Sequence, residues 1–410
     1  MTATQVDVPP IISVDDHIME PPTLWTDRLP AKFRAAAPRV KQAKVERIIY
    51  HGGQNFEMVE SEDGKPGDYW VYEDKVIPMK RINASAGMPL DLRENVPITY
   101  AEMRPSCYDV NARLADMDAG HMEASLCFPT FPRFCGQTFA EGNDKDLSLA
   151  CVQAYNDFMV EEWCGTSGGR LIPLCLIPLW DVELAVAEIH RNATRGVRAV
   201  AFSEIPYHLG LPSIHSGYWD PFFNACAETG TSINMHIGSS SKMPYTSPDA
   251  PNAVSVSLSF NNSVVALVDF LMSGILPRYP DLRLAFSEGQ IGWMPYVIER
   301  IDDVWIQHRA WAGVQDLVPE PPSTYFHKQV YGCFFRDRHG ARSLDVIGED
   351  NVLFEVDFPH TDSTWPDTKK LAEHDFAGLS AETIYKIVRG NAIKLYQLDL
   401  DKDLGAAPLK

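Results

Sequence analysis

Short apolar runs alternate with longer segments of helical periodicity along almost the whole chain. The apolar runs occupy residues 10–17, 124–130, 170–179, 196–204, 231–239, 281–289, 331–335 and 351–360. Strands that alternate with helices form right-handed β-α-β units and a parallel sheet. Eight such units predict an α/β fold, a (β/α)₈ TIM barrel. The length of 410 residues also permits an open doubly wound sheet, but no GxGxxG motif follows the first run.

Two helical segments carry recognisable end signals. Asp181 begins a segment that stops at Gly196, and it is expected to cap the N-terminus of that helix. Asp220 is expected to cap the next helix, with Pro221 at its first position and Gly230 beyond its end. These signals place helices directly between consecutive strands, as a barrel requires.

A long insertion interrupts this alternation. Residues 20–107 separate the first strand from the next helix, and their strand-like pieces alternate as a small β-meander would. Such a segment is uncommon unless it covers or shapes a site, so we predict a cap over the barrel mouth within a single domain, residues 1–410. We also expect the insertion to form part of an oligomer contact, because a contiguous aromatic patch is costly to expose. Its aromatic residues include Trp25, Tyr69, Trp70 and Tyr72.

The charge balance limits the partners of the chain. A net charge of −19 and a pI near 5.0 disfavour nucleic acid and anionic membrane surfaces. The first residues form neither a basic nor an apolar signal region, and no apolar run reaches the roughly 18 residues of a bilayer span. The eight cysteines contain no CxxC pair and are expected to be buried free thiols. We therefore expect a cytoplasmic enzyme that acts on a small molecule.

Titratable residues gather at the carboxyl ends of the predicted strands, where a parallel barrel carries its chemistry. They are Asp15, Asp16 and His17 on strand one, Glu204 on strand four, His236 on strand five, Glu288 on strand six, and Asp357 with His360 on strand eight. Residues two apart share a face, so Asp15 and His17 are expected to point inward and Asp16 away. Carboxylates and imidazoles are the ligands of Zn²⁺, Mn²⁺ or Fe²⁺, so the pattern predicts a divalent metal site.

Each of these residues also has a structural alternative. A strand-end histidine can simply pack, and a strand-end aspartate can cap the next helix. Glu288 precedes a helix and could be its N-terminal charge, and His360 and Asp362 could instead cap the loop after strand eight. The joint placement of four residues at the ends of strands one, five and eight favours metal binding. These four are Asp15, His17, His236 and Asp357.

The chain resembles the amidohydrolase-related proteins, in the branch that includes aminocarboxymuconate-semialdehyde decarboxylase and the dihydroxybenzoate decarboxylases. The likeness runs from SVDDHIMEPPTLW through MHIGSS and SEGQIGWMPYVIER to DFPHTDSTWP and RGNAIKLYQL. It implies a (β/α)₈ barrel that holds a divalent metal and forms a homo-oligomer such as a dimer. It also implies that Asp15 and His17 are the first-strand ligand pair, His236 the strand-five histidine and Asp357 the strand-eight aspartate.

Two positions depart from the pattern of this family. Many members have a histidine after strand six that handles protons or activates water, and this chain has Glu288 there. Glu204 lies where two-metal relatives place a bridging carboxylated lysine, and a glutamate could bridge two metals directly. Together these glutamates would supply the anionic ligands that a second divalent ion needs. The predicted metal ligands are therefore Asp15, His17, Glu204, His236, Glu288 and Asp357.

The leading hypothesis is metal-assisted hydrolysis or decarboxylation of a small carboxylate-bearing or cyclic substrate. One or two ions of Zn, Mn or Fe would act as Lewis acid and lower the pKa of bound water towards ~7. Asp357 would be a ligand or the general base, and Glu288 or His360 would shuttle protons. The alternatives are a dinuclear Mn/Fe oxygenase on the same barrel and a non-catalytic subunit with a vestigial site. The GxSxG match GTSGG at 165–169 precedes a strand instead of opening a helix, so it does not form the elbow of a nucleophilic serine. No HExxH motif of a zinc-protease helix occurs.

Overall fold

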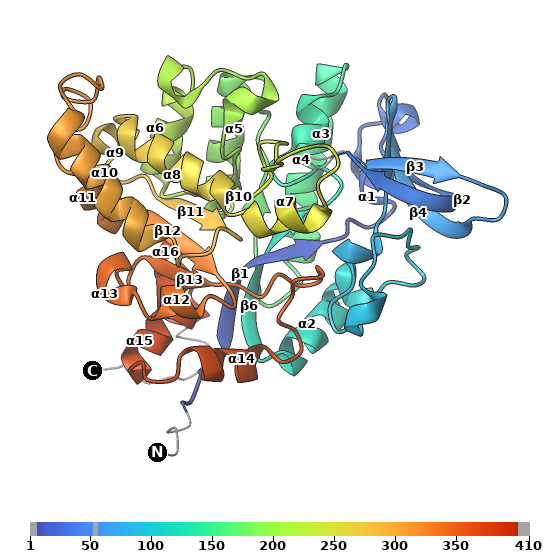
Figure 1. Ribbon diagram of the computed structural model, residues 1–410. Helices are drawn as coiled ribbons and strands as arrows, with labels where there is room; N and C mark the ends of the chain where they lie inside the picture. The colour runs from blue at the N-terminus through green and yellow to red at the C-terminus, as the bar shows by residue number, and fades with distance from the viewer. Residues whose placement is uncertain (1–5, 52–55, 401–410) are drawn as a thin grey trace.

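The computed structural model describes residues 6–51 and 56–400 of the chain (Figure 1). Parallel strands and helices alternate in it, and a separate antiparallel sheet follows the first strand. The parallel strands are β1 (Ile11–Ile18), β6 (Met122–Pro129), β7 (Leu171–Ile172), β8 (Leu174–Cys175), β9 (Ala199–Ala201), β10 (Ser232–His236), β11 (Leu284–Ser287), β12 (Val330–Phe334) and β13 (Val352–Phe354).

The parallel strands form two sheets whose edges meet. One sheet has the order β1-β6-β7, and the other has the order β8-β9-β10-β11-β12-β13. Only Pro173, which has no N–H to donate, separates β7 from β8, so one short run contacts both sheets. At the other edges, Asp357 N donates to Asp15 O at 2.8 Å and His17 N donates to Phe358 O at 2.6 Å. Each of the eight predicted runs contains a strand.

Most of these strands are shorter than predicted, because the polar residues at their ends leave the hydrogen-bonded ladder. The run predicted over 281–289 keeps only Leu284–Ser287, and the run over 351–360 keeps only Val352–Phe354. Glu288 and Asp357 therefore follow their strands and lie in the loops beyond them. Their backbone is therefore not held to the dihedral angles of a strand.

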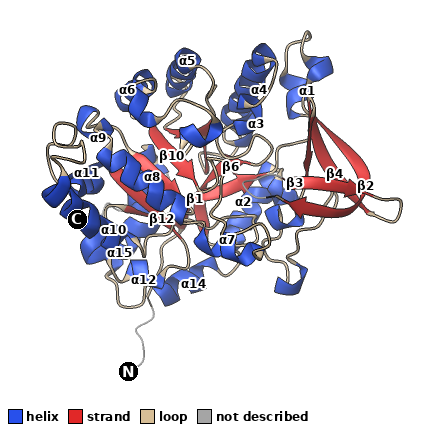
Figure 2. Cartoon of the chain, turned by 45° about the horizontal axis from the view of Figure 1, so that its top comes forward, coloured by secondary structure: helices blue, strands red, loops and turns tan. Residues whose placement is uncertain are grey.

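Helices surround the parallel strands, which lie in the middle of the molecule (Figure 2). Asp181 caps α5 as predicted, since its carboxylate accepts hydrogen bonds from the backbone of Glu183 and Leu184. The expected cap Asp220 is instead the first residue of α6, which ends at a left-handed Gly230. The helices are α1 (Leu24–Arg28), α2 (Val110–Ala119), α3 (Gln137–Ala140), α4 (Lys145–Phe158), α5 (Val182–Ala193), α6 (Asp220–Thr229), α7 (Asn252–Leu258), α8 (Asn261–Met272), α9 (Ile275–Arg278), α10 (Met294–His308), α11 (Pro322–Gln329), α12 (Arg338–Ala341), α13 (Leu344–Ile347), α14 (Thr368–Asp375), α15 (Ala381–Tyr385) and α16 (Asn391–Tyr396).

The insertion after β1 contains the predicted antiparallel sheet, which projects to one side of the parallel strands (Figure 1). Its later part packs against the loop that follows β13. There Ala86 N donates to Pro359 O and Thr361 N donates to Ile82 O, both at 2.9 Å. The insertion therefore contacts the carboxyl ends of the parallel strands. Its strands, in the order β3-β2-β4-β5, are β2 (Arg39–Tyr50), β3 (Phe56–Glu60), β4 (Lys65–Tyr72) and β5 (Lys75–Pro78).

The aromatic residues of the insertion do not form the exposed patch that the sequence led us to expect. Trp25, Trp70 and Tyr72 are buried inside the chain. The rings of Trp25 and Trp70 lie 4.9 and 4.7 Å from the ring of Phe131, in the loop after β6. These residues join the insertion to the parallel-stranded part, so they give no support to an oligomer contact. The cap within one domain of residues 1–410 stays a prediction.

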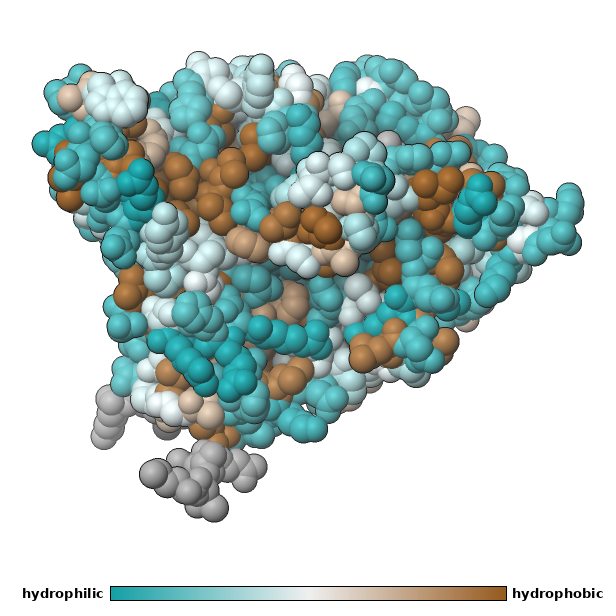
Figure 3. All heavy atoms as spheres, in the orientation of Figure 1, coloured by the Kyte–Doolittle hydropathy of each residue, from teal (hydrophilic) through white to brown (hydrophobic). Residues whose placement is uncertain are grey.

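Two further expectations concern the cysteines and the membrane. All eight cysteines are buried free thiols, as predicted. The segment Asn252–Met272 has the length and hydropathy that a membrane span would need, although 33% of it is buried. Apolar side chains gather over α7 and α8 (Figure 3), where Val256 and Val265 are 59% and 54% exposed. A helix of a soluble protein passes the same test, so the absence of membrane contact stays a prediction.

Candidate metal centre

Side chains from the ends of three strand runs converge at the carboxyl end of the parallel sheets. Asp15 and His17 lie on β1, His236 ends β10, and Asp357 follows β13. Ligand atoms of Asp15, His17 and His236 all lie within 4.8 Å of one another, and the same holds for His17, Asp357 and His360. All of them except His360 are fully buried or nearly so. The two groups share His17, which thus lies close to prospective ligands from the middle and from the C-terminal part of the chain.

Short distances link the members of these two groups, which share His17. His17 Nε2 lies 3.2 Å from Asp357 Oδ1 and 3.6 Å from Asp15 Oδ1. His236 Nε2 lies 3.3 Å from Asp15 Oδ2. These nitrogens and carboxylate oxygens are buried and form no hydrogen bond of acceptable geometry. Buried polar atoms without hydrogen bonds are rare and costly, so the cluster fits a divalent cation that would satisfy them.

The tautomer of His236 also fits a metal ligand. Its Nδ1 lies 2.7 Å from the carbonyl oxygen of Ile237 and donates a hydrogen bond to it. The lone pair of a neutral ring then lies on Nε2, which faces the cluster. Burial lowers the pKa of His236 to about 4, so the ring is neutral near pH 7.

Strand parity separates the three polar residues of β1. Asp16 points away from the cluster, and its carboxylate accepts hydrogen bonds from Ser13 Oγ at 3.1 Å and Phe358 N at 2.8 Å, and another from Ser125 Oγ. Asp16 therefore ties β1 to its neighbours on both sides and leaves Asp15 and His17 in the cluster, as the period of two predicts.

Arg113 of α2 donates a hydrogen bond to the backbone of the same strand. This side chain is fully buried, and its Nη2 donates to the carbonyl oxygen of His17 at 2.5 Å while its Nε donates to Ser106 O at 2.7 Å. The guanidinium also lies 4.7 Å from the ring centroid of Phe358. One arginine thus links β1 to the segment after β13. Sequence reasoning missed it because a single arginine in a helix carries no signal of burial.

Two acidic residues of the site have a strained backbone. Glu288 and Asp357 have φ angles of 56° and 57°, in the left-handed region that residues other than glycine adopt infrequently. Such conformations cost about 1–3 kcal/mol each and cluster at functional sites. The hydrogen bond from Asp357 N to Asp15 O holds one of them in place.

Glu288 lies at the edge of the cluster, with its Oε2 3.3 Å from His236 Nε2. Its backbone N–H donates to Glu355 Oε2 at 3.1 Å, and Glu355 is fully buried with no hydrogen bond to its other carboxylate oxygen. The sequence analysis did not single out Glu355. Its position two residues before Asp357, on the same face of the strand run, was the available signal.

The carboxylates of the site shift one another's protonation. Burial first, and then the charges of Glu355 and Asp357, raise the pKa of Asp15 well above its usual value. Burial and the charge of Asp357 do the same for Glu288. Although burial opposes it, the neighbouring His360 and His17 hold the pKa of Asp357 below its usual range. A divalent cation would reverse this repulsion, because its charge is the largest in such a site.

Glu204 belongs to neither group of prospective ligands within residues 6–51 and 56–400. Its Oε1 accepts hydrogen bonds from Gly238 N at 3.0 Å, Ser240 Oγ at 2.9 Å and Asn262 Nδ2 at 2.8 Å. Burial raises the pKa of Glu204 to about 7. Through these hydrogen bonds Glu204 holds the loop after β10 in place. Its role as a bridging ligand stays a prediction.

His360 lies between the cluster and the insertion. Its ring stacks on His17 with centroids 3.6 Å apart, and its Nδ1 lies 3.1 Å from Asp357 Oδ1. On the other side, Asn83 Nδ2 lies 3.1 Å from His360 Nε2. Asp362, which the sequence analysis also considered as a cap of this loop, is absent from both groups of prospective ligands.

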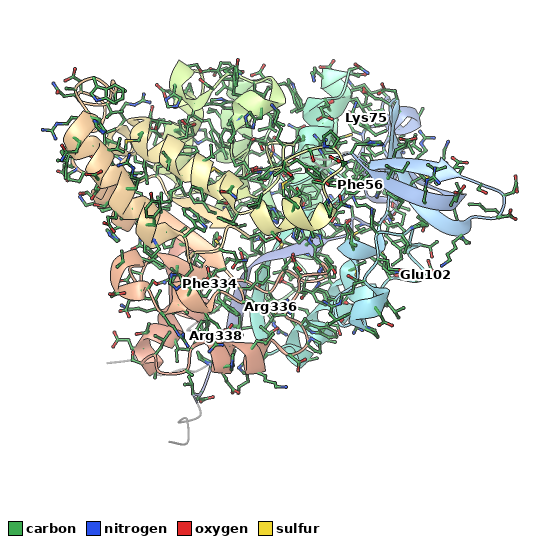
Figure 4. All side chains as sticks on the ribbon, viewed as in Figure 1. Phe56, Lys75, Glu102, Phe334, Arg336 and Arg338 are labelled. Atoms are coloured by element: carbon green, nitrogen blue, oxygen red, sulfur yellow. The ribbon has the colours of Figure 1, made fainter. Side chains whose placement is uncertain are left out.

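A cavity of about 560 Å³ lies beyond Asn83, between the insertion sheet and the loops after β6 and β10. Figure 4 shows two of its lining residues, Phe56 and Lys75, where the insertion sheet meets the parallel-stranded part. The four residues of the metal cluster do not line the cavity, but Asn83, which lines it, contacts His360 beside the cluster. Its size suits a small molecule.

Comparisons with known proteins concern the family and the fold of the chain. Residues 68–398 match the family described as amidohydrolase, whereas no curated protein matches the chain. An amidohydrolase from Mycobacterium avium subsp. paratuberculosis K-10 is 21% identical, with a TM-score of 0.68 over 95% of this chain and 99% of its own. The apo form of a Metarhizium anisopliae IDCase is 16% identical, with a TM-score of 0.64 over 95% and 98%. A 5-carboxyvanillate decarboxylase from Novosphingobium aromaticivorans DSM 12444, solved with manganese and 4-hydroxy-3-methoxy-5-nitrobenzoic acid, is 21% identical, with a TM-score of 0.57 over 72% and 82%. These structural likenesses establish a shared α/β fold.

Proposed function

Because the chain belongs to the amidohydrolase family, we propose that it is a metal-dependent carboxy-lyase that removes CO₂ from a small aromatic carboxylate. The observation that carries the proposal is the buried cluster of Asp15, His17, His236 and Asp357, whose ligand atoms lack hydrogen bonds. Decarboxylases of aromatic acids are among the proteins that share the fold. We further propose that the two parallel sheets form one (β/α)₈ barrel in a single domain, with residues 20–107 as its cap.

The four residues of the cluster would hold one divalent cation. Two carboxylates and two imidazoles suit Mn²⁺, Zn²⁺ or Fe²⁺, and manganese is present in the relative from Novosphingobium aromaticivorans. When bound, such a cation supplies a Lewis acid for an oxygen of the substrate. His236 is already oriented by Ile237, and His17 by the strand that Arg113 supports.

The residues around the cluster would handle the proton of the reaction. Decarboxylation breaks a carbon–carbon bond, releases CO₂ and leaves an electron pair on carbon that must take up a proton. Burial and the charge of Asp357 raise the pKa of Glu288 well above its usual value, and its carboxyl group lies 3.3 Å from His236 Nε2, so Glu288 is the proposed donor. His360 contacts both Asp357 and Asn83, so it can pass a proton between the cluster and the cavity.

The test uses full-length protein loaded with manganese and a panel of hydroxylated benzoates, with released CO₂ and the aromatic product measured together. We expect CO₂ release, and one deuterium on the ring carbon when the reaction runs in D₂O. The Asp357→Asn variant is the matched control and should release none. Metal-loaded protein that hydrolyses lactones or amides but releases no CO₂ from any acid would overturn the proposal.

Hydrolysis is the second candidate, and one observation favours it. Glu288 stands where many relatives of the resembled branch have a histidine, and a carboxylate beside His236 can act as a general base towards water. The oxygenase alternative requires two ions, one of them iron. Glu204 would have to bridge them, but one of its two oxygens already accepts at least three hydrogen bonds. Elemental analysis of anaerobically purified protein separates the cases, since two ions per chain including iron would favour the oxygenase.

The localisation, the oligomeric state and the partners of the enzyme are also proposals. We propose a cytoplasmic homo-oligomer, such as a dimer, that binds neither nucleic acid nor membranes. The exposed Val256 and Val265 on α7 and α8 offer an apolar surface for self-association. Light scattering on the purified protein measures its mass, and a monomer at micromolar concentration would contradict the oligomer.

A further inference from the structure

One lysine in the cavity beside the candidate site has no counter-ion among the described residues. The side chain of Lys80, just beyond β5, is only 8% exposed, and its Nζ lies 3.5 Å from the ring centroid of Phe56. Within residues 6–51 and 56–400, no carboxylate pairs with this ammonium and no oxygen accepts a hydrogen bond from it. A buried charge is normally paired, because desolvation without a partner is costly.

A second cation lies in the same cavity wall. Arg133, in the loop after β6, lines the cavity with Lys80, and its charge, after burial, lowers the pKa of that lysine to about 7. Glu141 and Ser241 accept hydrogen bonds from Arg133 Nη2, which orients the guanidinium. Its Nε is buried and makes no hydrogen bond. The wall therefore presents donors that the chain itself leaves unsatisfied.

The rest of the cavity is suited to a flat apolar body. Phe56, Trp70 and Phe131 line it together with aliphatic side chains of β5. Trp70 and Phe131 lie with ring centroids 4.7 Å apart, and both are buried. Aromatic walls with a few placed polar groups are typical of small-molecule pockets.

The other lysine of the cavity is a natural comparison. Lys75 also lines it, but its Nζ donates to the carbonyl oxygen of Glu141 at 3.2 Å and lies 3.5 Å from Asp74 Oδ1. The ammonium group of Lys75 thus has partners within the protein, whereas that of Lys80 has none among the described residues. The difference points to a ligand as the missing partner of Lys80.

We propose that Lys80, with Arg133 beside it, binds a second carboxylate of the substrate in the cavity that these residues line together with Asn83. The substrate class is then an aromatic dicarboxylate, with one carboxylate at the metal cluster and the other at Lys80. This proposal depends on the proposed function only for the position of the carboxylate that is removed. Lys80 is a specificity-determining residue of the insertion, and it takes no part in bond breaking.

The experiment compares two ligands of one shape that differ in a single charge. Benzene-1,3-dicarboxylate and 3-carbamoylbenzoate are titrated into full-length, manganese-loaded protein in a calorimeter at pH 6.5. A charge-assisted hydrogen bond inside a pocket favours the dicarboxylate by at least about tenfold in Kd. Lys80→Met should reduce this ratio to near one, while Lys75→Met should leave it unchanged. Benzoate affinity that is equal in wild type and Lys80→Met would show that the pocket remains folded.

Lys80→Arg keeps the charge and should keep most of the preference. A ratio near one in wild type, or a ratio that Lys80→Met leaves intact, would overturn the proposal. The readout is binding, so it separates the two proposals of this article. Protein that prefers the dicarboxylate but releases no CO₂ from it would keep the subsite and overturn the decarboxylation.

Discussion

His17 and Asp357, from opposite ends of the chain, meet with Nε2 and Oδ1 3.2 Å apart. The backbone of the same two segments is joined on both sides of this contact, by Asp357 N to Asp15 O and by His17 N to Phe358 O. The hydrogen bonds that bring β1 beside the end of the β13 run are therefore the ones that bring the prospective ligands together. The contacts that join the two edges of the parallel sheets therefore also position His17 and Asp357.

Removing the charge of Asp357 should remove the metal. We expect Asp357→Asn to lower the metal content from about one ion per chain to less than a tenth, because one of four ligand residues loses its anionic oxygen. Asparagine tolerates the left-handed backbone of this position, so the fold should persist. Elemental analysis after dialysis measures the effect, with Asp362→Asn as the matched control. A full complement of metal in the variant would exclude Asp357 as a ligand.

Metal binding should stabilise the protein. An ion held at one hundred times its Kd adds about 2.7 kcal/mol to the free energy of unfolding. We expect Mn²⁺ to raise the melting temperature of wild type and excess chelator to lower it, while the melting temperature of Asp357→Asn responds to neither. Equal responses of both proteins would place the bound ion elsewhere.

Replacement of Glu204 distinguishes its two roles. The hydrogen bonds to its Oε1 predict that Glu204→Gln destabilises the loop after β10 by about 1–3 kcal/mol, because an amide cannot accept all of those bonds as well as a carboxylate. The metal content should stay unchanged. Denaturant unfolding and elemental analysis on the same sample measure both quantities. Loss of one ion per chain with unchanged stability would instead make Glu204 a bridging ligand.

Lys80 should make stability depend on pH. Its pKa is about 7 in the folded protein and near 10.5 in an unfolded chain, so the unfolded state binds more protons between these values. Stability therefore rises with pH in this window. We expect the free energy of unfolding of wild type, relative to Lys80→Met, to increase by about 2 kcal/mol from pH 7 to pH 9. The charged groups Arg133, Lys75 and Glu141 line the same cavity and are present in both proteins, so the comparison isolates Lys80. A difference that does not change with pH would show that the lysine is fully charged.

The strand ends were the most predictable part of the site. Asp15 and His17 follow from the period of two in β1, and His236 and Asp357 follow from the alternation of strands and helices. In the predicted run 351–360, Glu355 and Asp357 are two residues apart and would share a face, so the same rule could have found Glu355. Glu204 also sits at a strand end, but its side chain turns to the loop after β10, and strand periodicity does not encode such loop contacts.

The insertion was less predictable, because its partners lie far away in the sequence. Its aromatic residues were expected at an oligomer contact, whereas Trp25 and Trp70 pack on Phe131 of the same chain. The sequence does not show that Asn83 contacts His360, or that Lys80 has no counter-ion within the part of the chain that the structure describes. Both facts depend on how the insertion packs against the loops that follow the strands, which no local pattern determines.

Glu288 is the residue on which the type of reaction depends. Its carboxylate lies 3.3 Å from His236 Nε2, and burial together with Asp357 raises its pKa. As the proton donor of a decarboxylation, Glu288 should be replaceable neither by glutamine, which cannot give up a proton, nor fully by aspartate, which is shorter. We expect Glu288→Gln to lower kcat by about 10²–10⁴-fold with little change in KM or metal content, since general acid–base catalysis contributes that factor.

Glu288→His, which restores the residue common in the resembled branch, completes the comparison. This variant should recover part of the decarboxylation lost in Glu288→Gln, because imidazolium can also donate a proton. Rates of CO₂ release and of ester or lactone hydrolysis are measured on all three proteins at equal metal content. If Glu288→Gln keeps full decarboxylation but loses hydrolysis, the glutamate is a base that activates water and the enzyme is a hydrolase. If Glu288→Gln instead loses its metal, the residue is a ligand, and the proton must come from His360, the other titratable side chain placed between the cluster and the cavity.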